Sequence, residues 1–431
     1  MTVHRMIWNQ TAYFGPGAIS VIPQEIASRG FTRAFVVTDR VLVDTGVSRR
    51  VTDLLDAAGV PFVLFTDIRP NPPVENVLAG LAAFREAGAD VLVSVGGRSP
   101  QDTCKAIGII AANPEFSDVV SLEGVAATRN PSVPIIAVPT TAGTASETTI
   151  NYVITDTARR RKVVCADPRD IPVLAVVDPE MMASAPRALK VATGLDALTH
   201  AIEGYVTPGS FELSDMFHLK AIQMIARALA PAADGDAEAI DRMAMAQYIA
   251  GMGYSNVGLG LVHGMAHPLG AFFGAPHGVA NGILLPSVLE YNAPFTGEKY
   301  RDIAAAFRVR GATTDPIEEV RARTVGAIRD LAVSLGNPTR ISEVGATEAD
   351  VQPLAEAAFE DVCTGGQPAD THRRGDRRAV PLAVVRPGAW SPCRRVPWVP
   401  RVPPVCPGQR GRPRQPGRTS RAEPSGPHAQ N

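Results

Sequence analysis

Three of the chain's eight histidines fall within fifteen residues, in the stretch His263 to His277, which reads HGMAHPLGAFFGAPH. His263 and His267 are four residues apart, so in a helix both imidazoles leave the same face. Pro268 predicts a break or kink that turns the chain toward His277. Isolated core histidines are the plainer interpretation. A cluster in apolar surroundings needs partners, however, so the spacing predicts a metal or acid–base site.

A second pair, Asp196 and His200, lies four residues apart in ATGLDALTHAIEGYV, a run with helical spacing. An ordinary helix acid and a surface histidine are the alternative. Together with the clustered histidines, the pair makes a possible set of four metal ligands. Nitrogen and oxygen ligands suit Fe(II), Zn(II), Co(II), Mn(II) or Ni(II), and residue types alone do not choose among these metals or among the three clustered histidines.

The first 186 residues alternate short β-branched runs with longer amphipathic runs. Strands are predicted at 34–39, 61–67, 91–97 and 135–141, with helices at 51–59 and 74–90. This alternation with short links predicts an α/β dinucleotide-binding domain, built on a doubly wound parallel sheet, over residues 1–186. Such sheets bind ligands at the carboxyl ends of their strands.

Polar residues collect where the predicted strands end. Asp39 closes the first strand, where a carboxylate can accept hydrogen bonds from ribose hydroxyls, although a helix N-cap is the alternative. The segment 96–102, GGRSPQD, opens a helix after the third strand, so its amides can hold a pyrophosphate. The segment 139–147, PTTAGTASE, follows the fourth strand. Two such loops at one sheet edge predict a nucleotide site.

Beyond Pro186, strand-like runs largely vanish, and helical patterns follow at 188–206, 214–233 and 238–267. They predict an all-α domain over residues 187–370. No apolar run reaches eighteen residues and the first residues lack an apolar leader, so we expect a cytoplasmic protein. The five cysteines form no CxxC pair, so neither a disulfide framework nor a structural zinc site is expected.

The formal net charge of −1 combines two unlike parts. Residues 371–431 hold thirteen arginines, no lysine, two acids and 12 of the 37 prolines, which predicts a disordered basic tail. Residues 1–370 carry 29 basic and 41 acidic groups, so nucleic-acid binding is not expected as their main task. An arm that attracts RNA or a membrane is one interpretation of the tail.

We favour another interpretation of the tail, a shifted reading frame. The run THRRGDRRAVPL can be encoded so that a shift of one base reads PTVEEIVALYRS, which has a capping box and an apolar helical face. Codons incompatible with that second frame would refute this interpretation.

Four motifs together resemble the iron-containing (group III) alcohol dehydrogenases over about residues 1–370: GGRSPQDTCKAIG, PTTAGTASETTINYVIT, ATGLDALTHAIEGY and NVGLGLVHGMAHPLGAFFGAPHGVANGILLP. The resemblance implies a homodimer with NAD(H) and Fe²⁺, for which Zn²⁺ is a possible substitute. It implies the metal ligands Asp196, His200, His263 and His277, and it leaves His267 near the nicotinamide as a catalytic proton relay. The implied cofactor contacts are Asp39, Asn71, Gly97, Arg98, Ser99, Asp102, Thr140, Thr141, Thr144, Asn151 and Lys162.

Within that family, the resemblance implies interconversion of lactaldehyde and 1,2-propanediol. The metal would polarise the carbonyl, NADH would deliver hydride, and a proton would arrive through His267, a ribose hydroxyl or water. Asn151 and Tyr254 are expected to shape a small pocket. Dehydrogenases of other small alcohols or glycerol are the alternatives, together with a metallohydrolase that uses the same four ligands. No nucleic-acid or membrane partner is expected.

One position departs from the family's pattern. Where the family's phosphate loop reads GGGS, this chain reads GGRS, which puts Arg98 where glycine permits a positive φ. Either the backbone accommodates arginine and its side chain touches a phosphate, or cofactor binding is weakened. We expect weakened binding.

Overall fold

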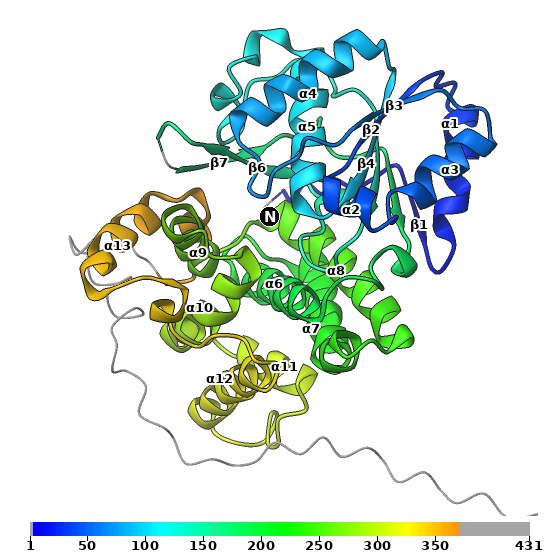
Figure 1. Cartoon of the computed structure of the whole chain (residues 1–431). Helices are drawn as coiled ribbons and strands as arrows, with labels where there is room; N and C mark the ends of the chain where they lie inside the picture. Colours follow the sequence, from blue (N-terminus) through cyan, green and yellow to red (C-terminus); the bar gives the residue numbers. More distant parts are fainter. Residues whose placement is uncertain (1–2, 160, 370–431) are drawn as a thin grey trace, which may run out of the picture. The chain divides into compact units, whose positions relative to one another are not determined.

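A six-stranded parallel sheet forms the N-terminal part of the computed structural model, which describes residues 3–159 and 161–369 (Figure 1). Its strands lie in the order β1 (Thr11–Phe14), β8 (Leu174–Val177), β5 (Ile135–Pro139), β4 (Val91–Gly96), β2 (Ala34–Val37) and β3 (Phe62–Phe65). Every neighbouring pair is parallel, so the carboxyl ends of all six strands meet at one edge.

Helices cover both faces of this sheet. They are α1 (Ile22–Ser28), α2 (Arg40–Asp44), α3 (Arg49–Ala57), α4 (Val74–Ala87) and α5 (Arg98–Ala112). Phe35 and Val37 pack in one core with α4 and α5, whereas Ala34 and Val36 pack in another with α1 and α3. A strand buried on both faces needs apolar residues at every position, which explains the continuous apolar runs. The predicted doubly wound α/β fold is confirmed.

The C-terminal part is helical, as expected. Its helices are α6 (Arg187–Val206), α7 (Glu212–Ala233), α8 (Ala237–Val257), α9 (Leu261–Phe273), α10 (His277–Asn292), α11 (Lys299–Ala306), α12 (Ile317–Ser334) and α13 (Val351–Glu360). One continuous apolar core joins α6 to α10. Because α6 is buried along most of its length, its polar residues Asp196 and His200 lie inside the protein.

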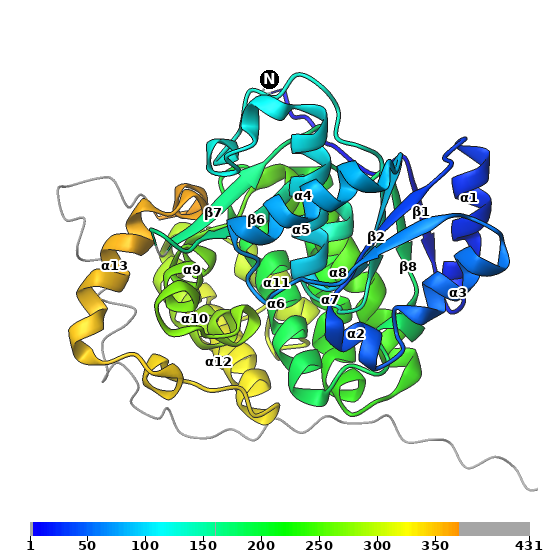
Figure 2. The same ribbon diagram turned by 45° about the horizontal axis from the view of Figure 1, so that its top comes forward.

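Four of the strands were not predicted from the sequence. β1 (TAYF) is a partly exposed run that lacks the continuous apolar pattern of the buried strands, and the buried apolar run of β8 (LAVV) was overlooked. The antiparallel hairpin of β6 (Asn151–Asp156) and β7 (Arg161–Ala166) forms a separate two-stranded sheet. This hairpin contacts α4 and α5 on one side and α9 on the other, as Figure 2 shows from a second angle. It therefore links the sheet to the helices that carry the histidines.

Two local predictions around the histidines were wrong. The helical pattern expected over 238–267 is divided at Gly258, whose φ of 91° and ψ of −178° suit glycine. Pro268 does not break α9, which continues to Phe273 and ends at Gly274 with φ 67°. The helix loses one hydrogen bond at the proline, and packing of α9 against α10 and α13 offsets that loss. The turn toward His277 thus comes at Gly274.

The change from strands to helices falls where the sequence placed it, since β8 ends at Val177 and α6 begins at Arg187. The described residues of both parts belong to one compact unit, so separate domains over 1–186 and 187–370 stay a prediction. The tail at 371–431, including its frameshift interpretation, lies outside the described residues. Within the described part of the chain, no helix is long and apolar enough to cross a membrane.

Candidate metal centre and cofactor cleft

Three helices bring one carboxylate and three imidazoles to a single point. Asp196 and His200 leave the same face of α6, His263 lies in the first turn of α9, and His277 begins α10. The Oδ1 atom of Asp196 lies 3.8 Å from Nε2 of His200, 3.8 Å from Nε2 of His263 and 3.5 Å from Nε2 of His277. All four candidate ligand atoms lie within 4.8 Å of one another.

This donor set fits a divalent metal. Ligand atoms about 2.1 Å from a tetrahedral ion stand roughly 3.4 Å apart, close to the distances measured here. Burial lowers the pKa values of His200 and His263 to about 3 and lowers that of His277 well below its ordinary value. The imidazoles are therefore neutral at physiological pH, as metal ligation requires. Three nitrogens and one oxygen suit Fe²⁺ and, equally by ligand type, Zn²⁺.

His267 lies beside this group but has different partners. Its ring is stacked on that of His277, with centroids 5.4 Å apart and an interplanar angle of 14°. Its Nδ1 atom lies 2.8 Å from Oδ2 of Asp361, and its buried Nε2 has no hydrogen-bond partner among the described residues. One ring nitrogen is thus held by a carboxylate while the other is available for proton transfer.

Three polar residues that contact the cluster were not identified from the sequence. Asn281 donates from Nδ2 to Oδ1 of Asp196 at 2.6 Å, Glu203 contacts His263 at 2.6 Å, and Asp361 contacts His267. Glu203 follows His200 by three residues, so helical spacing could have placed it on the ligand face of α6. Asn281 follows His277 by four residues in α10, a comparable signal. Asp361 carries no local signal.

The predicted phosphate loop begins α5 at the carboxyl end of β4. Gly97 is the helix N-cap, and a Cβ atom there would lie 3.1 Å from Oγ1 of Thr141, so a larger residue would crowd the loop. Asp102 is buried and accepts hydrogen bonds from Ser146 Oγ at 2.7 Å and from the Val153 amide at 2.9 Å. Asp102 therefore anchors the loop at 146 and the hairpin to α5, and both of its oxygens are engaged.

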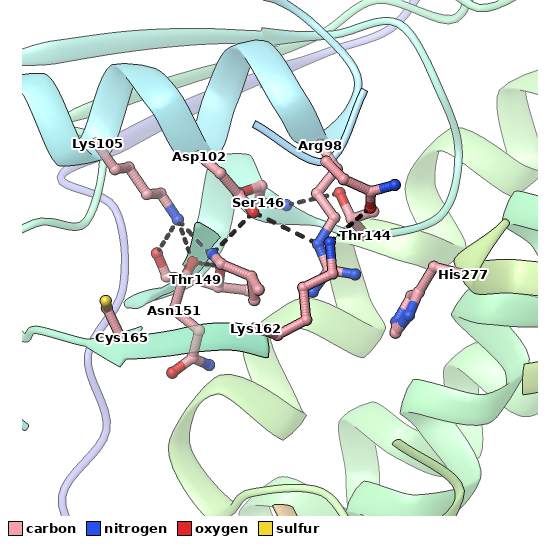
Figure 3. Close-up of polar contacts among 12 residues, drawn as sticks. Arg98, Asp102, Lys105, Thr144, Ser146, Thr149, Asn151, Lys162, Cys165 and His277 are labelled. Carbon is pink, nitrogen blue, oxygen red and sulfur yellow. Dashed lines mark hydrogen bonds and ion pairs between the residues drawn. The ribbon is translucent and has the colours of Figure 1, made fainter. Parts of the chain in front are cut away.

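Arg98 is the first residue of α5 and has helical backbone geometry, so the strained positive φ expected for it is absent. The αR region is allowed for residues with a side chain, so the backbone conformation at this position does not require glycine. The side chain extends toward Lys162, with its Nε 3.4 Å from Oδ2 of Asp102 and His277 across the cleft (Figure 3). Burial, aided by the Arg98 charge, lowers the pKa of Lys162 to about 8.

Arg98 also lines a small pocket of about 30 Å³, together with Asn71, Ser99, Lys162, His267 and His277. Most of these residues are predicted cofactor contacts, so we expect the arginine side chain to compete with a bound dinucleotide for this space.

Replacing Arg98 with glycine is therefore expected to lower the KM and Kd for NADH about tenfold, which corresponds to about 1.4 kcal/mol. Steady-state kinetics and NADH fluorescence titration measure the two constants. Arg98→Ala, which keeps a good helix former at this position, is the control for backbone effects and should behave alike. An unchanged KM and Kd for NADH in both variants would refute the idea that the Arg98 side chain obstructs cofactor binding.

Other predicted cofactor contacts are hydrogen-bonded within the protein. Asp39 is the N-cap of α2, and its Oδ1 accepts a hydrogen bond from the Leu42 amide at 2.9 Å. The helix-capping role, given above as the alternative to ribose binding, is therefore present. Lys162 donates to Asn71 Oδ1 at 2.8 Å and to Thr155 Oγ1 at 3.0 Å. Thr140 pairs through its amide with the Gly96 carbonyl at 3.1 Å. These hydrogen bonds are internal to the protein, and the cofactor roles of the residues stay predictions.

A cavity of about 440 Å³ opens onto the histidines. Its lining includes Arg98, Thr144, Asn151, His200, Tyr254, Leu259, His263, His267 and Cys363. Tyr254 stacks on His200 with centroids 4.2 Å apart and donates to the Thr144 carbonyl at 2.6 Å, which ties the metal cluster to the loop after β5. Asn151 and Tyr254, expected to shape a pocket, line the same cavity.

Known proteins resemble the chain along nearly all of its described length. Lactaldehyde reductase from Escherichia coli (strain K12) is 56% identical over 367 residues, covering 85% of this chain and 95% of that protein. A crystal structure of 1,3-propanediol oxidoreductase, 36% identical, superposes with a TM-score of 0.84 and covers 89% of this chain and 99% of the other. Sulfoacetaldehyde reductase from Bifidobacterium kashiwanohense, solved with NAD⁺, is 28% identical with a TM-score of 0.77, over 86% and 96% of the two chains.

Family models agree with this likeness. Residues 9–179 match the iron-containing alcohol dehydrogenase model, and residues 190–375 match the C-terminal model of the same family. The matched segments contain both the sheet edge at which the carboxyl ends of the strands meet and the cluster of Asp196 with three histidines. The parallel sheet, the cluster of Asp196 with three histidines and the family models agree, so the chain belongs to the iron-containing alcohol dehydrogenase family and is an NAD-linked oxidoreductase.

Proposed function

We propose that this enzyme interconverts lactaldehyde and 1,2-propanediol, with Fe²⁺ held by Asp196, His200, His263 and His277. The observation that carries the proposal is the convergence of three imidazole Nε2 atoms on Asp196 Oδ1 beside a cavity. The relative that is 56% identical bears the name lactaldehyde reductase, which supports the choice of substrate. Zn²⁺ is the expected substitute, since the same donors accept it.

The metal supplies Lewis acidity toward the substrate oxygen, and NADH supplies the hydride. The chain's own residues position the reactants and manage the proton. His267, with Nδ1 held by Asp361 and Nε2 without a partner among the described residues, is placed to give a proton to the product oxygen or to take it back in the reverse direction. Asn151 and Tyr254 bound the cavity around the substrate.

Consumption of NADH tests this proposal directly. Purified enzyme loaded with Fe²⁺ should lower the near-ultraviolet absorbance of NADH when lactaldehyde is added, and chelation of the metal should stop the reaction. A panel of propanal, glyceraldehyde and dihydroxyacetone distinguishes other small-alcohol and glycerol dehydrogenases. Hydrolysis of an ester without loss of NADH would instead support the metallohydrolase.

Asp39 is proposed to select NAD(H), because its carboxylate repels the 2′-phosphate of NADP(H). Asp39→Gly should lower the ratio of kcat/KM for NADH over NADPH at least tenfold, and it should cost only about 0.3 kcal/mol through loss of the N-cap, because glycine is itself tolerated there. Asp39→Asn keeps a capping oxygen without the charge, so it should change the ratio without that loss of stability. An unchanged ratio in both variants would show that Asp39 is only a cap.

A homodimer and a cytoplasmic location, expected from the resemblance and the sequence, stay predictions. Light scattering of the purified protein measures the first.

A further inference from the structure

Glu203 is a buried carboxylate on the helix that carries two of the proposed metal ligands. Asp196, His200 and Glu203 are spaced by four and three residues along α6, so their side chains leave one face of that helix. Glu203 is only 3% exposed. A buried carboxylate needs specific partners, and those of Glu203 lie in α9.

Both oxygens of Glu203 are engaged at short distances. Oε2 lies 2.6 Å from Nδ1 of His263, and Oε1 accepts a hydrogen bond from the Val262 amide at 2.6 Å. The other nitrogen of the same ring, His263 Nε2, faces Asp196 Oδ1 at 3.8 Å. A proton on Nδ1, shared with Glu203, therefore leaves the Nε2 lone pair directed into the metal cluster.

The start of α9 holds Glu203 in this position. The N-cap residue Gly260 offers no side-chain hydrogen bond, so the amides of the first turn need acceptors from elsewhere. Glu203 accepts from Val262, and Oε1 of Gln367 accepts from Leu261 at 3.3 Å. A Cβ atom at Gly260 would lie 3.0 Å from Glu203 Oε1, so the glycine allows this close approach.

We propose that Glu203 is a positioning residue for the metal centre: its carboxylate fixes the Nδ1–H tautomer and the ring orientation of His263, so that Nε2 is preorganised to bind the ion. The role rests on the proposed metal site. It acts through His263 and not through contact with substrate or cofactor. Carboxylates that hold metal-binding histidines in this way typically contribute 10- to 100-fold to metal affinity.

The competing explanation is that Glu203 only caps α9. Glu203→Gln, compared with a variant that affects only capping, separates the two explanations. Glutamine has one acceptor oxygen for two donors, the Val262 amide and His263 Nδ1–H, so it must release one of them. We expect the Kd for Zn²⁺, measured by competition with a chromophoric chelator, to rise 10- to 100-fold in this variant. The d–d absorption of the Co²⁺-loaded protein should change as well, because it reports ligand geometry and not activity.

Two control variants match the substitution. Gln367→Ala removes the other acceptor at the start of α9, together with the hydrogen bonds of Gln367 to Asn292, without touching His263, so it tests the capping contribution to metal binding. Glu147→Gln neutralises a carboxylate that is also fully buried and that accepts from Gln247 Nε2, away from the four proposed ligands. Both controls should keep the Zn²⁺ Kd within about threefold of wild type, which is less than the range typical of orienting groups.

A measurement on the unaltered protein avoids any question of variant folding. In the metal-free wild type labelled with ¹⁵N-histidine, His263 should carry its proton on Nδ1 and none on Nε2. A proton on Nε2 with none on Nδ1 would mean that Glu203 itself donates, and this would overturn the proposal. An unchanged Zn²⁺ Kd in a folded Glu203→Gln variant, or an equal loss in Gln367→Ala, would overturn it too. Failure of wild type to bind Zn²⁺ would instead refute the metal centre on which the role rests.

Discussion

Replacing His263 with alanine is expected to abolish stable metal binding and to lower kcat by at least about 10³-fold. The imidazole Nε2 of His263 is one of the four atoms that converge within 4.8 Å, and alanine leaves three. A Lewis acid contributes several kcal/mol to the reaction, and each 1.36 kcal/mol changes the rate tenfold. Metal content by elemental analysis and kcat with lactaldehyde measure the two effects on the same preparation.

His218 provides the matched control for this variant. It is a fully buried histidine of α7 whose ring nitrogens have no partner among the described residues, and burial lowers its pKa to about 3. His218→Ala should cost about 2–4 kcal/mol of unfolding free energy through the cavity it leaves. It should nevertheless retain the metal. Normal metal content and rate in His263→Ala would exclude His263 from the ligand set.

Replacing Asp361 with asparagine is expected to lower kcat about 10²-fold while metal affinity stays unchanged. Asp361 holds His267 through Oδ2 at 2.8 Å and accepts the Cys363 amide through Oδ1 at 2.9 Å. Asparagine has only one acceptor for these two donors, so the imidazole loses either its orientation or its tautomer. Rapid-mixing measurements of NADH oxidation separate this effect on the chemical step from product release.

The variant His267→Ala completes the test of this pair. If Asp361 acts through His267, both single variants and the double variant should show losses of similar size, since residues acting as a unit are not additive. If the loss of kcat in the double variant equals the product of the two single losses, the residues do not act as a pair and Asp361 has a separate role. The Zn²⁺ affinity of Asp361→Asn also distinguishes this carboxylate from Glu203, whose loss should weaken metal binding.

Much of the fold followed from local patterns in the sequence. Continuous apolar runs such as Ala34–Val37 marked the buried strands, because a parallel sheet covered on both faces leaves no polar position. Helical spacing placed Asp196 and His200 on one face of α6. Strand β1 was missed because its partly exposed run TAYF lacks that continuous apolar pattern, whereas the apolar run of β8 was overlooked. Pro268 was misjudged because packing against neighbouring helices outweighs one lost hydrogen bond.

Local sequence patterns were sufficient to predict the α/β and helical parts, the family resemblance and the residue types that could bind a metal. Tertiary structure alone decided which groups meet. Glu203 and His263 are 60 residues apart, and Asp361 and His267 are 94 apart. The side chain of Arg98 likewise reaches the cleft through the placement of α5 beside β6. Periodicity reports only neighbours along one element, whereas these contacts depend on how separate helices pack against one another.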